Sequence, residues 1–497
     1  MSTHAKHEPR EEGGLRRELS VWGVIGLSLA TFAPSLAATL TPQASAASIG
    51  RAVPLAFIVA TLGVLLVGWT FVRLTQRFRH AGSVYGFVGA TIGARAGLVS
   101  GWSLLGVYIL FAVITSAASG LFISAFLSEA GIWSEPPTWV SYVFAALILW
   151  LVWALATRPV KAAARTVLVI EGITVALILF VSIVVGIKLL TGSGAHGHHL
   201  EAVAFSVPSG TGLSAVFLGA VYGFLAFAGF EAAATLGEET REPRRAIPRA
   251  ILGTVLFAGV FFIFVTWIEV SAFGADDAGL KAFTSSSSLI GDIARTYLSG
   301  WLGNAITAGV AVSAFGSALA SVTGASRLTY AFARDGVFPA TVATTDDRGN
   351  PKRATTAAVI AVAIILAVLA IILRLTPFEV FADGGAVSVL ILLLVYALAT
   401  IGAAKLLFTS GTKQVARWEV AVPAITLIVL FYTLYRNVIP YPSGAAAWFP
   451  IAAIVWVGIG TAWVFARPAA AERAGAALAA DEGLNALSDN AEGAERL

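Results

Sequence analysis

The segment FLAFAGFEAAATLGEETREPRRAIPRAI, residues 224–251, places an acidic side chain inside an apolar run. The run begins at Leu213, and Glu231 follows Gly229 in it with no lysine or arginine nearby. A charged side chain at the centre of a membrane helix costs roughly 3 kcal/mol on insertion scales. We therefore expect Glu231 to be uncharged for part of a functional cycle or to face a water-filled cavity.

The composition around this segment is that of a membrane protein. Of the 497 residues, 58% are hydrophobic and only 12% are charged, and the mean hydropathy is +0.84. The apolar runs are about 20 residues or longer, the length that an α-helix needs to cross a bilayer. Membrane β-strands would instead show short alternating segments. We predict an all-α polytopic membrane protein, and the absence of cysteine excludes disulfides.

The apolar runs predict twelve transmembrane helices, at about 20–45, 52–73, 96–127, 137–157, 164–190, 213–238, 247–273, 303–330, 354–374, 379–402, 417–437 and 445–466. With a cytoplasmic N-terminus, 26 of the 32 Lys and Arg residues fall in inner segments, as the positive-inside rule requires. We expect a plasma (inner) membrane protein with both termini cytoplasmic. Residues 1–19 and an acidic, solvated or partly helical tail, 467–497, would flank the transmembrane domain at 20–466.

Motifs of enzymatic chemistry are missing from the sequence. It contains no Walker-type phosphate loop, no HExxH and no nucleophile elbow, so we expect neither an enzyme nor a cofactor. The scattered basic residues form no nucleic-acid-binding patch. The loop GSGAHGHHLE, residues 192–201, gathers His196, His198 and His199. A metal site is one interpretation of this loop, but we favour a flexible polar loop because ligand spacing is lacking.

Two of the predicted helices carry helix-breaking residues. The first contains Pro34, which removes a backbone donor and clashes with the preceding turn, so we expect a break within 30–35. The sixth has weak points at Gly223 and Gly229. Interrupted helices at corresponding places in two halves indicate a transporter with inverted repeats and a midplane site. Repeats at about 20–190 and 213–402 would each hold five helices, whereas a proline kink and a small-residue packing notch are the alternative.

The same residues carry a family resemblance. FAGFEAAATLGEETREPRRAIPRAI, residues 227–251, closely resembles the sixth-span signature of the amino acid–polyamine–organocation (APC) permeases, which runs F-x-G-F-E, G-E-E and N-P-x-x-x-I-P-x-A-I. SRLTYAFARDGVFP at 326–339, followed by GNPKRA, is similar to the family's loop after span 8. HAGSVYGFVGATIGARAGLVSGW at 80–102 is similar to its entry into span 3. The resemblance covers residues about 15 to 465.

The resemblance implies a leucine-transporter-type fold, with a 5+5 inverted repeat, broken helices 1 and 6, and two peripheral helices at about 417–466. It also implies a secondary transporter of amino acids or amines, usually proton-coupled. Two positions depart from the family pattern. Residues 30–35 read ATFAPS where the family has a Gly-rich break that holds the substrate carboxylate, which puts carboxylate recognition in doubt. Glu171 stands where several proton-coupled members carry a lysine, so their coupling chemistry cannot be assumed.

The predicted substrate site lies between the two breaks. Freed carbonyl groups would face an ammonium group there, and aromatic rings can hold a cation against their faces. Phe32 and Phe227 could instead be packing residues. The predicted substrate-binding residues are Ala30, Thr31, Phe32, Ala33, Ser35, Phe227, Ala228, Gly229 and Phe230, with Tyr108 and Thr115 of the third span.

The coupling ion is predicted to be a proton carried by Glu231, with Glu171 as the competing carrier. Glu231 could also bridge backbone groups freed by the breaks, or contact a substrate amine. Glu171 lies nearer the inner end of its span, where we expect a solvated or structural role. Ser313 and Ser317 share a helix face with further small residues. This face could ligate sodium, but we favour helix packing.

Acidic groups outnumber basic ones in the predicted spans. Besides Glu171 and Glu231, we expect Glu269 and Asp383 to be solvated residues at the outer rim, where Lys188 and Arg374 would also reach the interface. We predict a transporter that imports an amino acid or organic amine by alternating access and prefers amines and cations to dicarboxylates. The alternatives are a sodium-coupled or exchanger-type carrier of a polyamine or other substrate, a channel, or a nutrient sensor.

Overall fold

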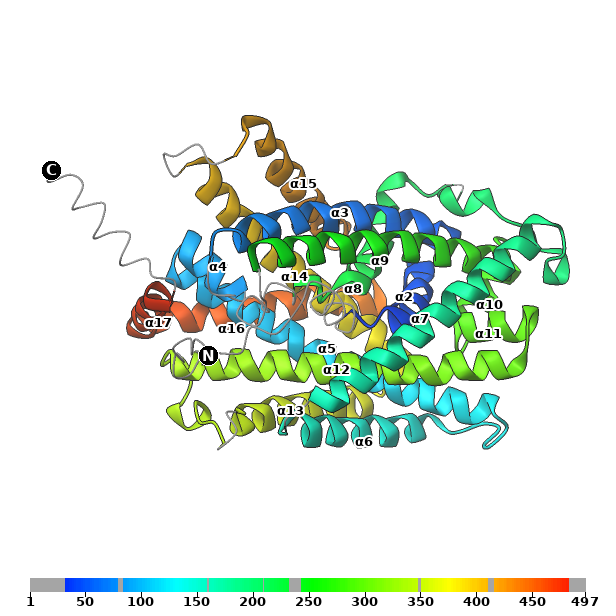
Figure 1. Ribbon diagram of the computed structural model, residues 1–497, viewed down its shortest axis with the longest axis horizontal. Coiled ribbons are helices and arrows are strands. Elements are labelled where there is room, and N and C mark those ends of the chain that lie inside the picture. Colours follow the sequence, from blue (N-terminus) through cyan, green and yellow to red (C-terminus); the bar gives the residue numbers. More distant parts are fainter. Residues whose placement is uncertain are drawn as a thin grey trace, which may run out of the picture.

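The computed structural model describes residues 32–78, 84–158, 161–208, 210–231, 243–346, 350–409 and 415–481 (Figure 1). Within these ranges the regular structure is entirely helical, and ten helices are long and apolar enough to cross a membrane. One of the ten, Pro34–Thr75, is divided by the short turn Gly50–Ala52. The all-α prediction is therefore confirmed, while the count of twelve spans and the inverted repeat stay predictions.

The helices are α2 (Pro34–Ile49), α3 (Val53–Thr75), α4 (Val84–Thr91), α5 (Ala94–Glu129), α6 (Thr138–Ala156), α7 (Lys161–Leu190), α8 (Val216–Phe227), α9 (Pro243–Phe273), α10 (Asp277–Ser285), α11 (Leu289–Tyr297), α12 (Gly300–Arg334), α13 (Lys352–Ala367), α14 (Pro377–Phe408), α15 (Ala421–Arg436), α16 (Trp448–Ala466) and α17 (Pro468–Asp481).

The centre of the bundle is formed by α5, which packs along both α12 and α14. By contrast, α6, α13 and α15 lie at the periphery (Figure 1). They expose large apolar side chains such as Trp150, Ile364 and Ile428, which are 62%, 58% and 67% exposed. Apolar surface of this extent suits lipid rather than water. The exposed faces thus agree with a multi-pass membrane protein.

A reciprocal tryptophan pair joins α16 to the central helix α5. The rings of Trp102 and Trp456 stack with centroids 4.9 Å apart. Each indole N–H donates to the other residue's backbone carbonyl, at 2.9 and 3.1 Å. Gly106 and Gly460 leave room for the rings, because a Cβ atom there would lie 2.1 and 2.2 Å from the opposite indole. The last predicted span is thereby fixed to the third.

The two ends of the bundle carry different short helices. α10 and α11 lie at one end, and α17 lies at the other (Figure 1); we call these the α10 end and the α17 end. In α17 the side chains of Ala470, Ala471 and Ala474 are buried, and the helix packs against α4, α5 and α16. This part of the tail is thus a helix docked on the bundle, which fits the partly helical alternative.

Candidate functional site

The first predicted break is present beside Pro34. Ala33 has the left-handed backbone angles φ 48° and ψ 60°, which a residue with a Cβ rarely adopts, and α2 starts at the proline that follows. Proline is suited to this first helical position because no partner is needed for its missing N–H group. Phe32, Ala33 and Ser35 are all buried. Ala30 and Thr31 lie outside the described residues.

The second predicted break is present at Gly229. α8 ends at Phe227, Ala228 is extended, and Gly229 has φ 107°, a conformation that favours glycine. Gly223 lies inside α8, so it marks no break. A Cβ atom on Gly223 would lie 2.6 Å from that of Ala60, which explains the glycine by close packing on α3.

The two breaks meet through aromatic side chains. The ring centroids of Phe32 and Phe227 are 6.3 Å apart in an edge-to-face arrangement. Phe227 also contacts Phe262 of α9 at 5.4 Å, and Phe262 in turn contacts Phe57 of α3 at 5.8 Å. All four rings are buried. Removing or moving Phe227 would therefore open space directly between the two breaks.

Glu231 ties the second break to α14. Its Oε2 atom accepts a hydrogen bond from the Gly229 N–H and another from the Tyr396 hydroxyl, both at 3.0 Å. The rings of Phe230 and Tyr396 lie 5.6 Å apart and both contact Phe71. Glu231 is 4% exposed. The carboxyl group thus accepts a hydrogen bond from a backbone N–H that the break leaves free. It also accepts one from a side chain of a distant span, so it joins the two.

Glu171 occupies the corresponding position at the first break. Its Oε1 atom accepts a hydrogen bond from the Ser35 N–H at 2.9 Å, and the Ser313 hydroxyl accepts one from the Leu36 N–H at 3.3 Å. Glu171 is 5% exposed, so of the two expected roles, solvated or structural, the structural one fits its surroundings. Side chains from α7 and α12 therefore satisfy the first free N–H groups of α2, as N-capping side chains do.

The remaining predicted residues lie on α5 and α12. Thr115 is buried, and its hydroxyl donates to the Phe111 carbonyl of its own helix at 2.6 Å. The ring of Tyr108 packs on Gly324, where a Cβ atom would lie 3.2 Å from it. Ser317 is buried on the same face as Ser313, one turn further along α12.

The polar residues predicted for the outer rim differ in their surroundings. Glu269 is fully buried, so its assignment as a solvated rim residue is wrong, whereas Asp383 is half-buried. Lys188 donates to the Tyr297 carbonyl.

In the histidine-containing loop, His198 is bonded to the Ala272 carbonyl at 2.8 Å through its Nδ1 atom. Within the described ranges, no three His, Asp or Glu side chains gather as metal ligands.

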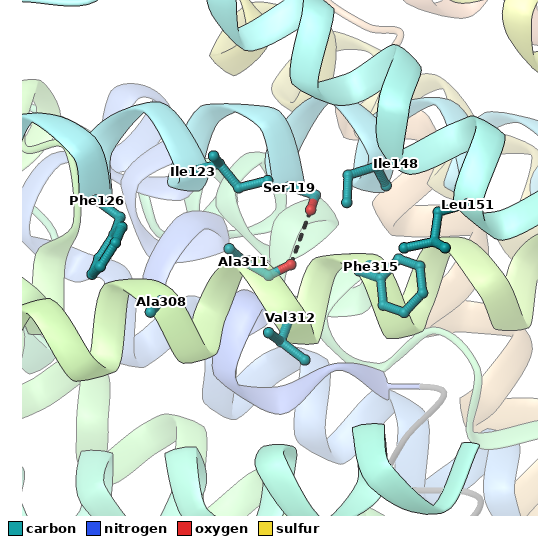
Figure 2. Close-up of a pocket in the computed structure, with 9 residues that line it drawn as sticks. All are labelled: Ser119, Ile123, Phe126, Ile148, Leu151, Ala308, Ala311, Val312 and Phe315. Atoms are coloured by element: carbon teal, nitrogen blue, oxygen red, sulfur yellow. Dashed lines mark hydrogen bonds between the residues drawn. The ribbon is translucent and has the colours of Figure 1, made fainter. Parts of the chain in front are cut away.

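A groove of about 300 Å³ opens between α5, α6 and α12 (Figure 2). Its lining consists of Ser119, Ile123, Phe126, Ile148, Leu151, Ala308, Ala311, Val312 and Phe315. The Ser119 hydroxyl donates to the Ala311 carbonyl at 3.0 Å, so the polar group in the lining is already bonded. The groove contains none of the predicted site residues and offers no charge to an amine or carboxylate.

Two contributors to the site were not predicted from the sequence. Tyr396 supplies the second donor to Glu231, and Phe262 completes the aromatic contact with Phe227. Tyr396 is a polar residue inside the apolar run LILLLVYALA, residues 390–399, which is a usable signal. Phe262 stands in the phenylalanine-rich stretch FFIF, and its pattern gives no reason to select it over its neighbours.

An all-helical bundle with lipid-suited faces, in which one helix begins at Pro34 and another ends at Phe227 inside the buried core, is typical of membrane transporters. Residues 19–462 match the family model described as amino acid permease. The chain belongs to this family, which confirms the APC resemblance and the expectation that the protein is not an enzyme.

Three relatives illustrate the substrates named within the family. The low-affinity putrescine importer PlaP of Escherichia coli K12 is 28% identical over 65% of this chain and 68% of its own. The branched-chain amino acid permease BcaP of Lactococcus lactis is 24% identical over 68% of this chain and 73% of its own. The methylthioribose transporter of Bacillus subtilis is 25% identical over 65% of this chain and 69% of its own.

Proposed function

We propose that the protein imports an organic amine or amino acid by alternating access, driven by a proton gradient across the plasma (inner) membrane. The α17 end would be cytoplasmic, because the positive-inside rule places both termini there. The contact between Phe32 and Phe227, which joins the start of α2 to the end of α8, carries this proposal. In such carriers the substrate binds where interrupted helices leave backbone groups free at mid-membrane.

The distribution of free backbone groups favours an ammonium group over a carboxylate. The N–H groups of Ser35 and Leu36, which could hold an anion at the start of α2, are already bonded to Glu171 and Ser313. The end of α8 at Phe227 lies beside the first break, and a helix C-terminus, whose last carbonyl groups lack helical partners, attracts positive charge. The substrate's amine would therefore bind beside Phe227, between the segments 32–35 and 227–230.

The coupling proton is proposed to bind to the carboxyl group of Glu231 or Glu171. Each carboxyl group is buried and bonded to a backbone N–H at a break, so a movement that opens the site would change its solvation directly. Sodium coupling through Ser313 and Ser317 is the alternative. The bond between Ser313 and the Leu36 N–H supports the packing interpretation of this serine face.

Uptake by purified protein in liposomes tests the proposal. Radiolabelled putrescine, lysine, leucine and glutamate are offered with an inward proton gradient, with a sodium gradient, and with no gradient. We expect saturable, proton-stimulated uptake of an amine-bearing substrate and poor uptake of glutamate. Saturable uptake of none of these compounds would contradict the proposed function, and sodium-driven uptake that ignores pH would contradict the coupling ion.

A further inference from the structure

Glu269 is a fully enclosed carboxyl group near the α10 end of α9. It is 0% exposed. Both carboxyl oxygens are buried, and neither has a hydrogen-bond partner among the described residues. Buried polar groups are nearly always hydrogen-bonded in native proteins, so an unbonded carboxyl group calls for a functional explanation.

The position of Glu269 links the site to the α10 end. It lies seven residues after Phe262 on the same face of α9, which places it about 10 Å further along the helix axis. Phe262 contacts Phe227 at the break. One turn beyond Glu269 on this face, the ring of Phe273 contacts Phe283 of α10 at 5.6 Å. Along α9, Glu269 therefore lies between the contact with the second break and the contact with α10.

The helices at the α10 end are joined to the rest of the bundle by hydrogen bonds and an ion pair. The Gln43 side-chain amide of α2 donates to the carbonyls of Thr284 and Ser286, both at 2.8 Å. Arg295 of α11 forms an ion pair with Glu129 of α5. The first contact joins neutral groups, and the second is an ion pair whose Arg295 and Glu129 side chains are 23% and 9% exposed. Because α10 packs against α9, moving α10 away would bring water toward this end of α9 and Glu269.

The charged and titratable groups around Glu269 are engaged elsewhere or lie at the helix ends. On the elements packed against α9 they are Arg73 of α3, Arg165, Glu171 and Lys188 of α7, Asp277 and Lys281 of α10, Asp292, Arg295 and Tyr297 of α11, and Glu201, His198 and His199 beside the turn Ala202–Phe205. Lys188, Tyr297 and His198 bond to backbone carbonyls. None of the described groups donates to the Glu269 carboxyl.

Glu269 differs in this respect from the carboxyl groups at the breaks. Glu231 and Glu171 each accept hydrogen bonds from backbone N–H groups, which stabilise a negative charge. Glu269 has no donor, so nothing in this conformation compensates a charge on it. When water reaches it, the charge is solvated. The number of protons bound at Glu269 then depends on whether the α10 end is closed.

We propose that Glu269 is a proton-binding site that links closure of the α10 end to the uptake of one proton from that side. The carboxylate takes the proton from water while the end is open, and it becomes a neutral carboxylic acid when α10 closes. In the importer proposed above, this step would capture the coupling proton. That role in transport rests on the proposed function, whereas proton binding and closure do not.

Two measurements on the purified full chain in lipid nanodiscs test the proton site. Infrared difference spectroscopy reads the carbonyl stretch of a neutral carboxylic acid. We expect one such band to be lost in Glu269→Gln and retained in Glu201→Gln, a matched carboxylate at the same end. An unchanged spectrum in Glu269→Gln would overturn the proposal. Glu269→Leu provides a second variant, and it should fold because no hydrogen bond is removed.

The second measurement follows closure directly. Because the chain contains no cysteine, labels at Lys281→Cys on α10 and Glu135→Cys in the loop after α5 report the distance across this end without background. The ratio of closed to open protein should rise by up to about tenfold for each pH unit of acidification. The slope of its logarithm against pH gives the number of protons taken up on closure, and this number should fall by up to one in Glu269→Gln. An unchanged pH dependence in Glu269→Gln would refute the link. If the protein took up none of the substrates, only the proposed function would be refuted, and the proton-binding site at Glu269 would stand.

Discussion

The hydrogen bonds that Glu231 accepts from the Gly229 N–H and the Tyr396 hydroxyl form a clamp between the second break and α14. The bond between Tyr396 and Glu231 allows a quantitative test of this clamp. Tyr396→Phe removes a hydroxyl that lies 3.0 Å from Glu231 Oε2 and leaves the Gly229 N–H as the remaining donor to that oxygen. Hydrogen bonds between membrane helices contribute about 0.6 kcal/mol on average and about 1.7 kcal/mol at most. Because a carboxyl group is the acceptor and both residues are buried, we expect about 1.5 kcal/mol.

A double-mutant cycle measures this interaction. Tyr396→Phe, Glu231→Leu and the double variant are unfolded in mixed micelles of increasing dodecyl sulfate content, and the free energies of unfolding are compared. The coupling free energy should be about 1–1.5 kcal/mol. Tyr432→Phe, which removes a hydroxyl from the partly exposed surface of α15, serves as the control and should change stability by less than about 0.5 kcal/mol. Additivity of the two single changes within about 0.3 kcal/mol would refute the clamp.

Three further changes probe other parts of the account. Phe227→Ala removes a fully buried ring, so the free energy of unfolding should fall by about 3–5 kcal/mol and uptake should extend to bulkier amines; an unchanged uptake profile would count against the site. Gly120→Ala would place a Cβ atom 2.0 Å from a backbone carbonyl of α6 and should lower the melting temperature. Gly172→Ala, where a Cβ atom has nothing within 4 Å, is the control and should leave it unchanged. Equal melting temperatures of the two variants would contradict the close packing of α5 on α6. Ser313→Ala removes the acceptor for the Leu36 N–H and should cost about 1 kcal/mol while proton-driven uptake persists; loss of a sodium dependence would support the sodium alternative instead.

The sequence predicted the features that depend on local chemistry. Pro34 cannot continue a helix that precedes it, and Gly229 tolerates a positive φ, so both breaks could be predicted from residue type. The apolar runs predicted the spanning helices, because the length and hydropathy of a segment decide whether it inserts into a membrane. The family signature around Glu231 predicted the family, which the match over residues 19–462 confirms.

Features that depend on distant contacts could not be predicted in this way. Glu269 stands near the end of its apolar run and was assigned to the rim, but its side chain is fully buried. The helices α10 and α11 lie at the same end of the bundle. Glu171 was expected to have a solvated or structural role, but its partner, a backbone N–H group 136 residues earlier in the chain, could not be named. Tyr396 lies 165 residues from Glu231. Such pairings are set by tertiary packing, and a single sequence contains no periodicity that reports them.

The most direct test of the central claim is uptake of radiolabelled amines into liposomes that contain the purified wild-type protein. The account predicts saturable accumulation above equilibrium when the outside is acidic, and collapse of that accumulation when a protonophore dissipates the gradient. Neutral and cationic amines should compete for uptake, and glutamate should not. Accumulation that persists without any proton gradient, or the absence of saturable uptake across amines and amino acids, would contradict the account.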